Sequence, residues 1–156
     1  MKTKYIFMVS FSFFVISIVS IAISREGYIR GSEYVGNNNV TESKNIEYKI
    51  EGCDIKDNNL LIKGWIAKIG SSNKESIVGV ILHKDGTEYF IRANLFFRWD
   101  ISSQLNLVHN DSLPYGKIGF SASIADIPQA PREIKIYFKH DNVVHIINAR
   151  CLNENN

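Results

Sequence analysis

The sequence lacks the patterns from which most enzymatic and metal-dependent sites are built. Neither H-x-x-x-H nor C-x-x-C occurs among its four histidines and two cysteines, so the ligand spacing of common zinc sites is absent. There is no G-x-S-x-G elbow and no glycine-rich phosphate loop, which are signatures of serine hydrolases and nucleotide-binding proteins. We therefore expect a chain without catalytic activity, metal or cofactor.

The chain also lacks an excess of positive charge outside its first residues. It contains 18 Lys and Arg against 16 Asp and Glu, and Lys2 and Lys4 precede an apolar N-terminal run. From Arg25 onward, 16 basic residues therefore stand against 16 acidic ones. Because phosphate binding requires clustered basic side chains, this balance argues against a nucleic-acid partner.

A long uncharged stretch occupies the N-terminus. Residues 5–23 contain no charge and follow two lysines, a pattern that directs export and leaves the N-terminus in the cytoplasm. Their number approaches the length of a membrane span, which predicts a retained signal anchor over residues 1–24. The alternative is a signal peptide cleaved after Ser24, because Ala22 and Ser24 place small residues at the −3 and −1 positions. The folded domain then lies in the periplasm or cell exterior, either held at the inner membrane or secreted.

The rest of the chain divides into a linker, a domain and a tail. Residues 25–45 contain three glycines and three consecutive asparagines without apolar periodicity, which predicts a flexible tether. From Ile46 onward, short alternating segments are separated by turn residues, a pattern typical of an all-β sandwich or barrel. We expect this domain at residues 46–151 and a disordered tail at residues 152–156.

The clearest local signal is a hairpin over residues 77–93. Asp85-Gly86 lies between two β-branched apolar runs, as in a tight type I′ turn. This turn predicts one apolar face with the pairs Lys84–Thr87, Leu82–Tyr89, Val80–Ile91 and Val78–Ala93. On the opposite face Ile81 pairs with Phe90 between polar neighbours. The register implies that these two residues are exposed as a candidate contact patch, and a covering loop is the alternative.

Five further segments alternate in the same way, at residues 46–50, 60–69, 117–124, 133–140 and 143–149. About seven strands without a convincing long helix favour an immunoglobulin-like antiparallel sandwich, preceded by the N-terminal hydrophobic helix; a small barrel is the alternative. A glycine inside a strand, such as Gly64, indicates a bulge or a close approach by another backbone. We expect it to make room here for Trp65, which we place in the core. Residues 97–116 are irregular, and Asp100 is positioned there to cap a short helical turn.

The two cysteines flank the predicted domain. Cys53 lies at the end of the first strand and Cys151 just past the last. In an exported chain such a pair predicts a disulfide. It would close a loop of nearly the whole domain, and chain entropy then gives an upper stabilisation of roughly 4 to 5 kcal/mol.

Aromatic residues near loops are the main candidates for a binding site. Sugar-binding sites stack aromatic rings on pyranose faces while neighbouring polar residues bond the hydroxyls. Trp99 and Tyr115, with Arg98 and Asp100 in the same irregular stretch, form such a candidate set. The simpler role for Arg98 and Asp100 is a local ion pair or helix cap that stiffens the loop.

Three short motifs occur in order along the chain: Ile62-Lys63-Gly64-Trp65, Arg98-Trp99-Asp100-Ile101 and Gly119-Phe120-Ser121-Ala122. Over about residues 60–124 the chain thereby resembles small β-sandwich modules of bacterial surface-polysaccharide and cell-envelope proteins. In those modules a Gly-Trp strand, an Arg-x-Asp-Val/Ile turn and a Gly-Phe strand recur, and proline is more usual where Trp99 stands. The resemblance implies an accessory domain of the envelope.

These observations predict an exported, non-catalytic accessory or interaction protein of the bacterial cell envelope. Its expected partners are the membrane, through residues 5–23, and either an envelope membrane protein, such as machinery for polysaccharide assembly or modification, or a polysaccharide. A carbohydrate-binding module that uses the loop aromatics is the second hypothesis. An envelope-stress or phage-exclusion protein is the third.

Overall fold

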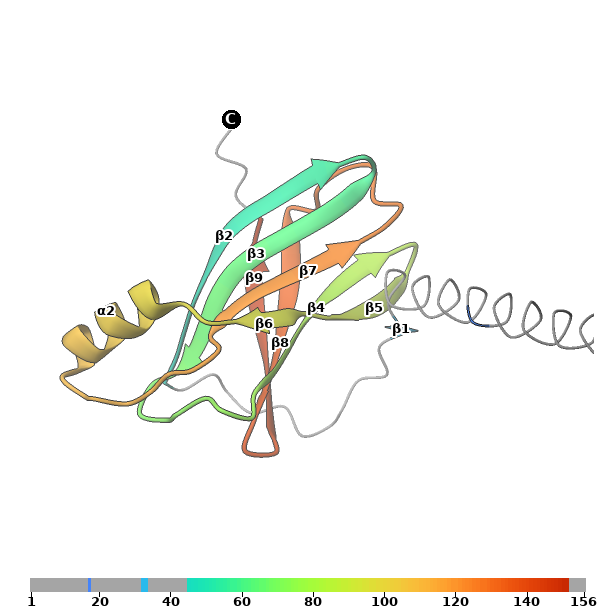
Figure 1. Cartoon of the computed structure of the whole chain (residues 1–156). Coiled ribbons are helices and arrows are strands. Elements are labelled where there is room, and N and C mark those ends of the chain that lie inside the picture. The colour runs from blue at the N-terminus through green and yellow to red at the C-terminus, as the bar shows by residue number, and fades with distance from the viewer. Residues whose placement is uncertain (1–16, 18–31, 34–44, 152–156) are drawn as a thin grey trace, which may run out of the picture.

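The computed structural model describes residues 17, 32–33 and 45–151, which form two antiparallel sheets and one helix (Figure 1). The β3 sheet has the order β2-β3-β7-β6, with β2 (Ile46–Lys56), β3 (Asn59–Lys68), β7 (Gly119–Ile124) and β6 (Asn94–Phe96). The β4 sheet has the order β5-β4-β8-β9, with β5 (Thr87–Arg92), β4 (Ile77–Lys84), β8 (Glu133–His140) and β9 (Val143–Arg150). Beside β5, the two-residue β1 (Ser32–Glu33) extends this second sheet.

The described residues thus form an all-β sandwich, as the alternation predicted. The structure differs from the predicted one in two elements, and each difference has a simple cause. Strand β6 has three residues, too few for alternation to be visible in the sequence. Helix α2 (Trp99–His109) occupies part of the stretch that we expected to be irregular, and its buried residues Ser102 and Leu105 give only a weak amphipathic pattern.

The predicted hairpin is confirmed in every pair. Lys84 pairs with Thr87, and each pair up to Gly79 with Arg92 follows the expected register. Asp85 and Gly86 both have positive φ, 51° and 81°, as a type I′ turn requires. The Ala93 amide donates to the Val78 carbonyl at 2.9 Å and extends the pairing past β5.

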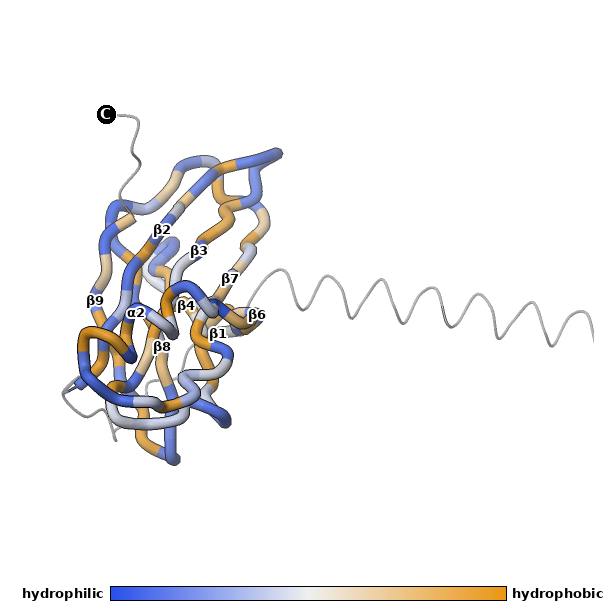
Figure 2. The backbone as a smooth tube through the Cα atoms, turned by 60° about the vertical axis from the view of Figure 1, so that its left-hand side comes forward, coloured by the Kyte–Doolittle hydropathy of each residue, from blue (hydrophilic) through white to orange (hydrophobic). Residues whose placement is uncertain are grey.

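The main core lies between the two sheets. Its largest fully buried side chains come from strands of both, among them Leu60, Ile62, Val80, Phe120 and Ile136. Hydrophobic and hydrophilic residues alternate along the strands in Figure 2, as expected where one face of each sheet is buried. On β9, Ile147 and Ala149 are the residues that join this core.

A second, smaller cluster joins the end of β3 to α2. Ala67 and Leu105 pack with Tyr115 and Ile118, and Trp65 lies partly buried against them. Trp65 therefore packs beneath the helix and not in the main core. In Figure 1, α2 projects from the end of the sandwich where β3 ends.

Gly64 lies where a bulge and a close backbone approach occur together, which is what a glycine inside a strand indicates. It lies opposite a β-bulge, where the pairing of β2 with β3 shifts between Ile50 and Gly52. A Cβ on Gly64 would lie 2.3 Å from the Lys49 carbonyl oxygen and 3.1 Å from the Phe120 ring. The missing side chain therefore admits the backbone of the neighbouring strand.

The outer strands of the two sheets are joined covalently. Cys53 on β2 and Cys151 after β9 form the predicted disulfide, with Cα atoms 5.5 Å apart. On the same pair of strands, the Tyr48 hydroxyl donates to the Asn148 carbonyl at 3.1 Å. One open side of the sandwich is therefore linked at two points.

Among the described residues, no helix is both long enough and apolar enough to span a membrane. The predicted segments at residues 1–24, 25–45 and 152–156 lie outside the described part of the chain, apart from Ser17, Ser32, Glu33 and Asn45.

Candidate functional site

Arg98 is the centre of the predicted loop site and binds two carboxylates. Its Nη1 and Nη2 donate to Glu51 at 2.6 and 3.1 Å, and its Nε and Nη2 donate to Asp100 at 2.9 and 2.7 Å. The predicted pair with Asp100 is therefore present. Glu51 was not predicted from the sequence, because the bulge in β2 places its side chain and no local sequence pattern predicts that bulge.

The same contacts determine the electrostatics of the site. Hydrogen bonds from the Arg98 guanidinium lower the pKa of Asp100 from 3.8 to about 2, and the bonds to Asp100 and Glu51 raise the pKa of Arg98. The predicted cap is wrong, because Arg98 occupies the N-cap position without a side-chain cap bond. Asp100 lies in the first turn instead, where its negative charge interacts favourably with the positive end of the helix dipole.

The three sequence motifs form one structural unit around Arg98. Gly64 pairs with Phe120, and Trp65 pairs with Gly119. A Cβ on Gly119 would lie 2.5 Å from the Phe96 ring and 2.7 Å from the Arg98 Cγ, so the Arg98 stem lies directly over this glycine. These motif residues support the fold where α2 begins.

Trp99, by contrast, lies at the surface. Its side chain is 71% exposed and stacks parallel to Phe97, with ring centroids 5.2 Å apart. The Lys117 ammonium lies 5.6 Å from the Phe97 centroid, within cation–π range. Large apolar side chains are also exposed elsewhere on β6 and α2. We name the whole set the α2 apolar surface: Phe96, Phe97, Trp99, Leu107 and Val108.

Tyr115 does not belong to this surface, and its prediction as a ligand-binding residue is wrong. Its side chain is fully buried in the cluster beneath α2, and its hydroxyl donates to Asp111 at 2.7 Å. Burial, together with the bond to Asp111, raises the pKa of Tyr115 to about 12. The phenol therefore supports the loop and has no face available for a sugar ring.

The predicted exposed patch of Ile81 and Phe90 is also wrong. The two residues pair as expected, but Ile81 is only 2% exposed. Its register partners are Phe90 and Lys135, and side chains of this length shield a residue between them. The half-buried Phe90 ring turns over Gly79 and contacts Tyr137 edge-on, with centroids 5.1 Å apart.

A histidine network that the sequence did not indicate lies at the end of β8. Buried His140 contacts Ser71 Oγ through Nε2 at 2.7 Å and Ser76 Oγ through Nδ1 at 3.1 Å. Asp141 Oδ2 also lies 3.0 Å from Nε2. The network therefore connects the loop at residues 70–76 to β8.

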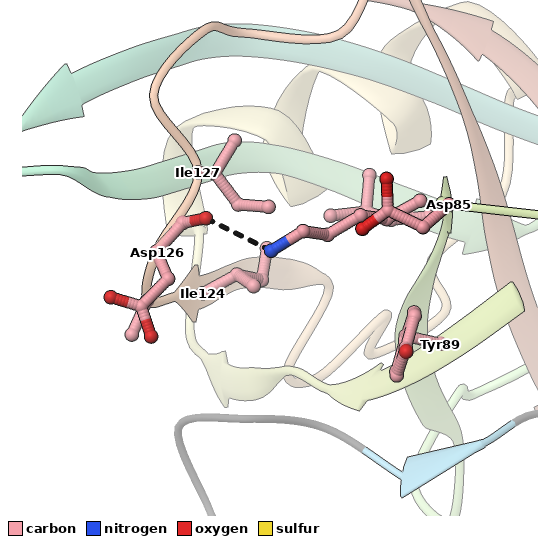
Figure 3. A pocket seen from close by; sticks show the side chains of 8 residues that line it. Asp85, Tyr89, Ile124, Asp126 and Ile127 are labelled. Carbon is pink, nitrogen blue, oxygen red and sulfur yellow. Dashed lines mark hydrogen bonds between the residues drawn. The ribbon is translucent and has the colours of Figure 1, made fainter. Parts of the chain in front are cut away.

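A pocket of about 240 Å³ opens beside the β4–β5 turn (Figure 3). Its lining comprises Leu82, Lys84, Asp85, Tyr89 and residues 124–127. The dashed line in Figure 3 is the bond that Lys84 Nζ donates to the Asp126 carbonyl at 3.2 Å. Ile124, which lines the pocket, pairs with Leu60 at the start of β3, whereas α2 lies where β3 ends. The pocket and α2 therefore lie at opposite ends of the sandwich.

Within the described ranges, no three His, Cys, Asp or Glu side chains are grouped as metal ligands would be, and the expected absence of a metal stays a prediction. The chain matches no protein-family model, no curated protein and no solved structure. Its function is therefore argued from the geometry alone.

Proposed function

We propose that this chain is a non-catalytic interaction protein of the bacterial cell envelope, exported and held at the membrane by residues 5–23. Its domain docks on a membrane-embedded envelope protein through the α2 apolar surface. The observation that carries the proposal is the exposure of large apolar side chains on one projecting element: 71% for Trp99, 84% for Leu107 and 66% for Val108.

Three features support docking by α2. Only Ser102 and Leu105 of the helix are buried, and Ile101 packs partly buried beside them. His109 contacts β2, so the remaining helix surface is available. The fork of Arg98 holds its first turn in place, which lowers the entropy cost of binding. Exposed Trp and Phe are also enriched at the centres of protein interfaces.

The location at the membrane rests on the N-terminal pattern, and the disulfide supports an oxidising compartment. An immunoglobulin-like topology is part of the proposal. The orders β2-β3-β7-β6 and β5-β4-β8-β9 correspond to strands A-B-E-D and C′-C-F-G of such a sandwich. Modules of this architecture commonly serve recognition at cell surfaces, which is an analogy of fold.

The test is site-specific photocrosslinking in intact cells of the source bacterium. A photoreactive residue at Leu107 is expected to give one discrete adduct with a membrane-embedded protein, identified by mass spectrometry. The same residue at exposed Asn142, in the β8–β9 turn, serves as the control and should give no such adduct. Trp99→Ala should abolish the adduct without changing the thermal unfolding temperature, because the Trp99 side chain is largely exposed. Crosslinks to lipid only, or an adduct unaffected by Trp99→Ala, would contradict the proposal.

A second candidate function is glycan binding at Trp99, and the open face of the stacked Trp99 ring favours it. Fewer polar groups than predicted are available to bond sugar hydroxyls there, because Arg98 and Asp100 bond each other and Tyr115 is buried. Glycan binding that is lost in Trp99→Ala while the photocrosslink persists would favour this second function.

A further inference from the structure

The pocket beside the β4–β5 turn combines an apolar floor with a polar rim. Leu82 and Ile124, each 4% exposed, form the floor, and Ile127 and the half-buried Tyr89 flank it. Figure 3 shows Asp85 and Asp126 on opposite sides of the pocket. A ligand that fits must therefore present an apolar face to the floor and polar groups to the rim.

The rim has unused hydrogen-bonding capacity. Among the described residues, the carboxylates of Asp85 and Asp126 and the hydroxyl of Tyr89 have no hydrogen-bond or ion-pair partner. Lys84 uses one donor on the Asp126 carbonyl and keeps two. The rim thus offers an aromatic hydroxyl, two carboxylates and an ammonium group around a small volume.

Charge and size narrow the class of ligand. Two carboxylates against one ammonium disfavour an anionic ligand such as a phosphate or an acidic metabolite. At about 240 Å³, the pocket is smaller than the range of roughly 300 to 1,000 Å³ typical for drug-sized ligands. A single ring with hydroxyls at its edge and C–H groups on its faces satisfies each condition.

We infer that this pocket binds one neutral pyranose residue of a glycan. The sugar face packs on Tyr89 and the aliphatic floor, its hydroxyls donate to Asp85 and Asp126, and Lys84 donates to a hydroxyl oxygen. The site lies at the opposite end of the sandwich from the α2 apolar surface and does not rest on the proposed docking function.

The test is saturation-transfer NMR on the full chain with the methyl glycosides of glucose, galactose, mannose and N-acetylglucosamine. The detergent must have a zwitterionic head group, because maltoside or glucoside detergents would occupy a sugar site. We expect transfer to at least one glycoside, with a dissociation constant in the millimolar range.

The variant Asp85→Gly/Asp126→Gly removes both carboxylates, and glycine accepts the positive φ values of 51° and 59°. We expect glycoside binding to weaken at least tenfold, because removing each carboxylate removes a charge-assisted hydrogen bond to the sugar. Asp57→Gly is the matched control, since Asp57 has a φ of 52° in another turn and does not line the pocket. It should leave binding unchanged.

Three results would overturn the inference. They are no transfer to any of the four glycosides, equal binding by the double variant, and binding lost in Trp99→Ala but kept in the double variant. The last would place the sugar on α2. None of them depends on whether Leu107 crosslinks to a membrane protein, so failure here and failure of the proposed function are distinguishable.

Discussion

Arg98 connects three segments that are distant in the sequence. It bonds Glu51 on β2 and Asp100 on α2, and its stem lies over Gly119 on β7. Arginine suits this position because its planar fork can bond two carboxylates at once, whereas an ammonium group on a flexible stem cannot match that geometry. The side chain is 21% exposed, so the contacts are only partly screened by water.

We therefore expect Arg98→Lys to lower the free energy of unfolding by about 1 kcal/mol, since one ammonium cannot replace both bidentate contacts. The measurement is equilibrium urea unfolding. Arg92→Lys, at an exposed end of β5, is the matched control and should have no effect. An equal loss in the two variants would mean that the fork contributes nothing beyond its charge.

Asp100 gives the pH dependence of this site. Its pKa is about 2 in the folded chain and 3.8 normally, so the folded state holds its proton less tightly. The resulting stabilisation is present above pH 3.8 and is lost as the pH falls toward 2. Urea unfolding from pH 5 to 2 should show this loss, and Asp100→Asn should flatten that part of the profile. An identical profile in the variant would contradict the assignment.

His145 is the least satisfied polar residue of the core. It is 4% exposed, lies near Phe138, and neither ring nitrogen has a hydrogen-bond partner among the described residues. We expect His145→Leu to raise the free energy of unfolding by about 1 kcal/mol, because a buried unbonded polar group costs that much or more. Chemical denaturation measures the change. A loss of stability would contradict this expectation.

At the scale of elements, the bulge in β2 and the glycine opposite it act together. The extra residue at Glu51 bends β2 so that the Lys49 carbonyl approaches the Cα of Gly64. The same bulge places Glu51 where it reaches Arg98. The close approach of two backbones and the position of a charged side chain thus have one cause.

Gly64→Ala should consequently destabilise the domain by at least 2 kcal/mol, because its Cβ would lie 2.3 Å from a backbone oxygen that cannot move without disturbing β2. Gly52→Ala, in the same bulge, would meet only the flexible end of Asp54 at 3.3 Å and should cost less than about 1 kcal/mol. Thermal unfolding of the pair provides the comparison. Similar losses of stability in both variants would mean that the backbone shifts to relieve the contact between the added Cβ and the Lys49 carbonyl oxygen.

At the scale of the whole molecule, the disulfide holds the two sheets together at one side. Cys53 and Cys151 are 98 residues apart, so their link restricts nearly the entire unfolded domain. We expect Cys53→Ala/Cys151→Ala to lower the free energy of unfolding by 2 kcal/mol or more, with roughly 4.7 kcal/mol as the entropic upper figure. Urea unfolding of both proteins, with and without reductant, tests this. Reductant should shift only the unsubstituted chain.

The sequence by itself determined what depends on local spacing. Asp85-Gly86 and its flanking alternation specified a hairpin and its register, because side-chain period and turn type leave one arrangement that buries an apolar face. The proximity of Arg98 and Asp100 specified their ion pair. The two cysteines, at the ends of a domain predicted to be exported, specified a disulfide.

The tertiary structure alone decided which of the candidate residues reach solvent. Tyr115 and Trp99 look alike in the sequence, but the packing of Leu105 and Ala67 buries Tyr115 and leaves Trp99 outside. Glu51 joined the site, and the pocket at Asp126 formed, through contacts between segments far apart in the chain. Such contacts depend on how two sheets and a helix pack, and no local pattern of residues specifies which distant segments come together.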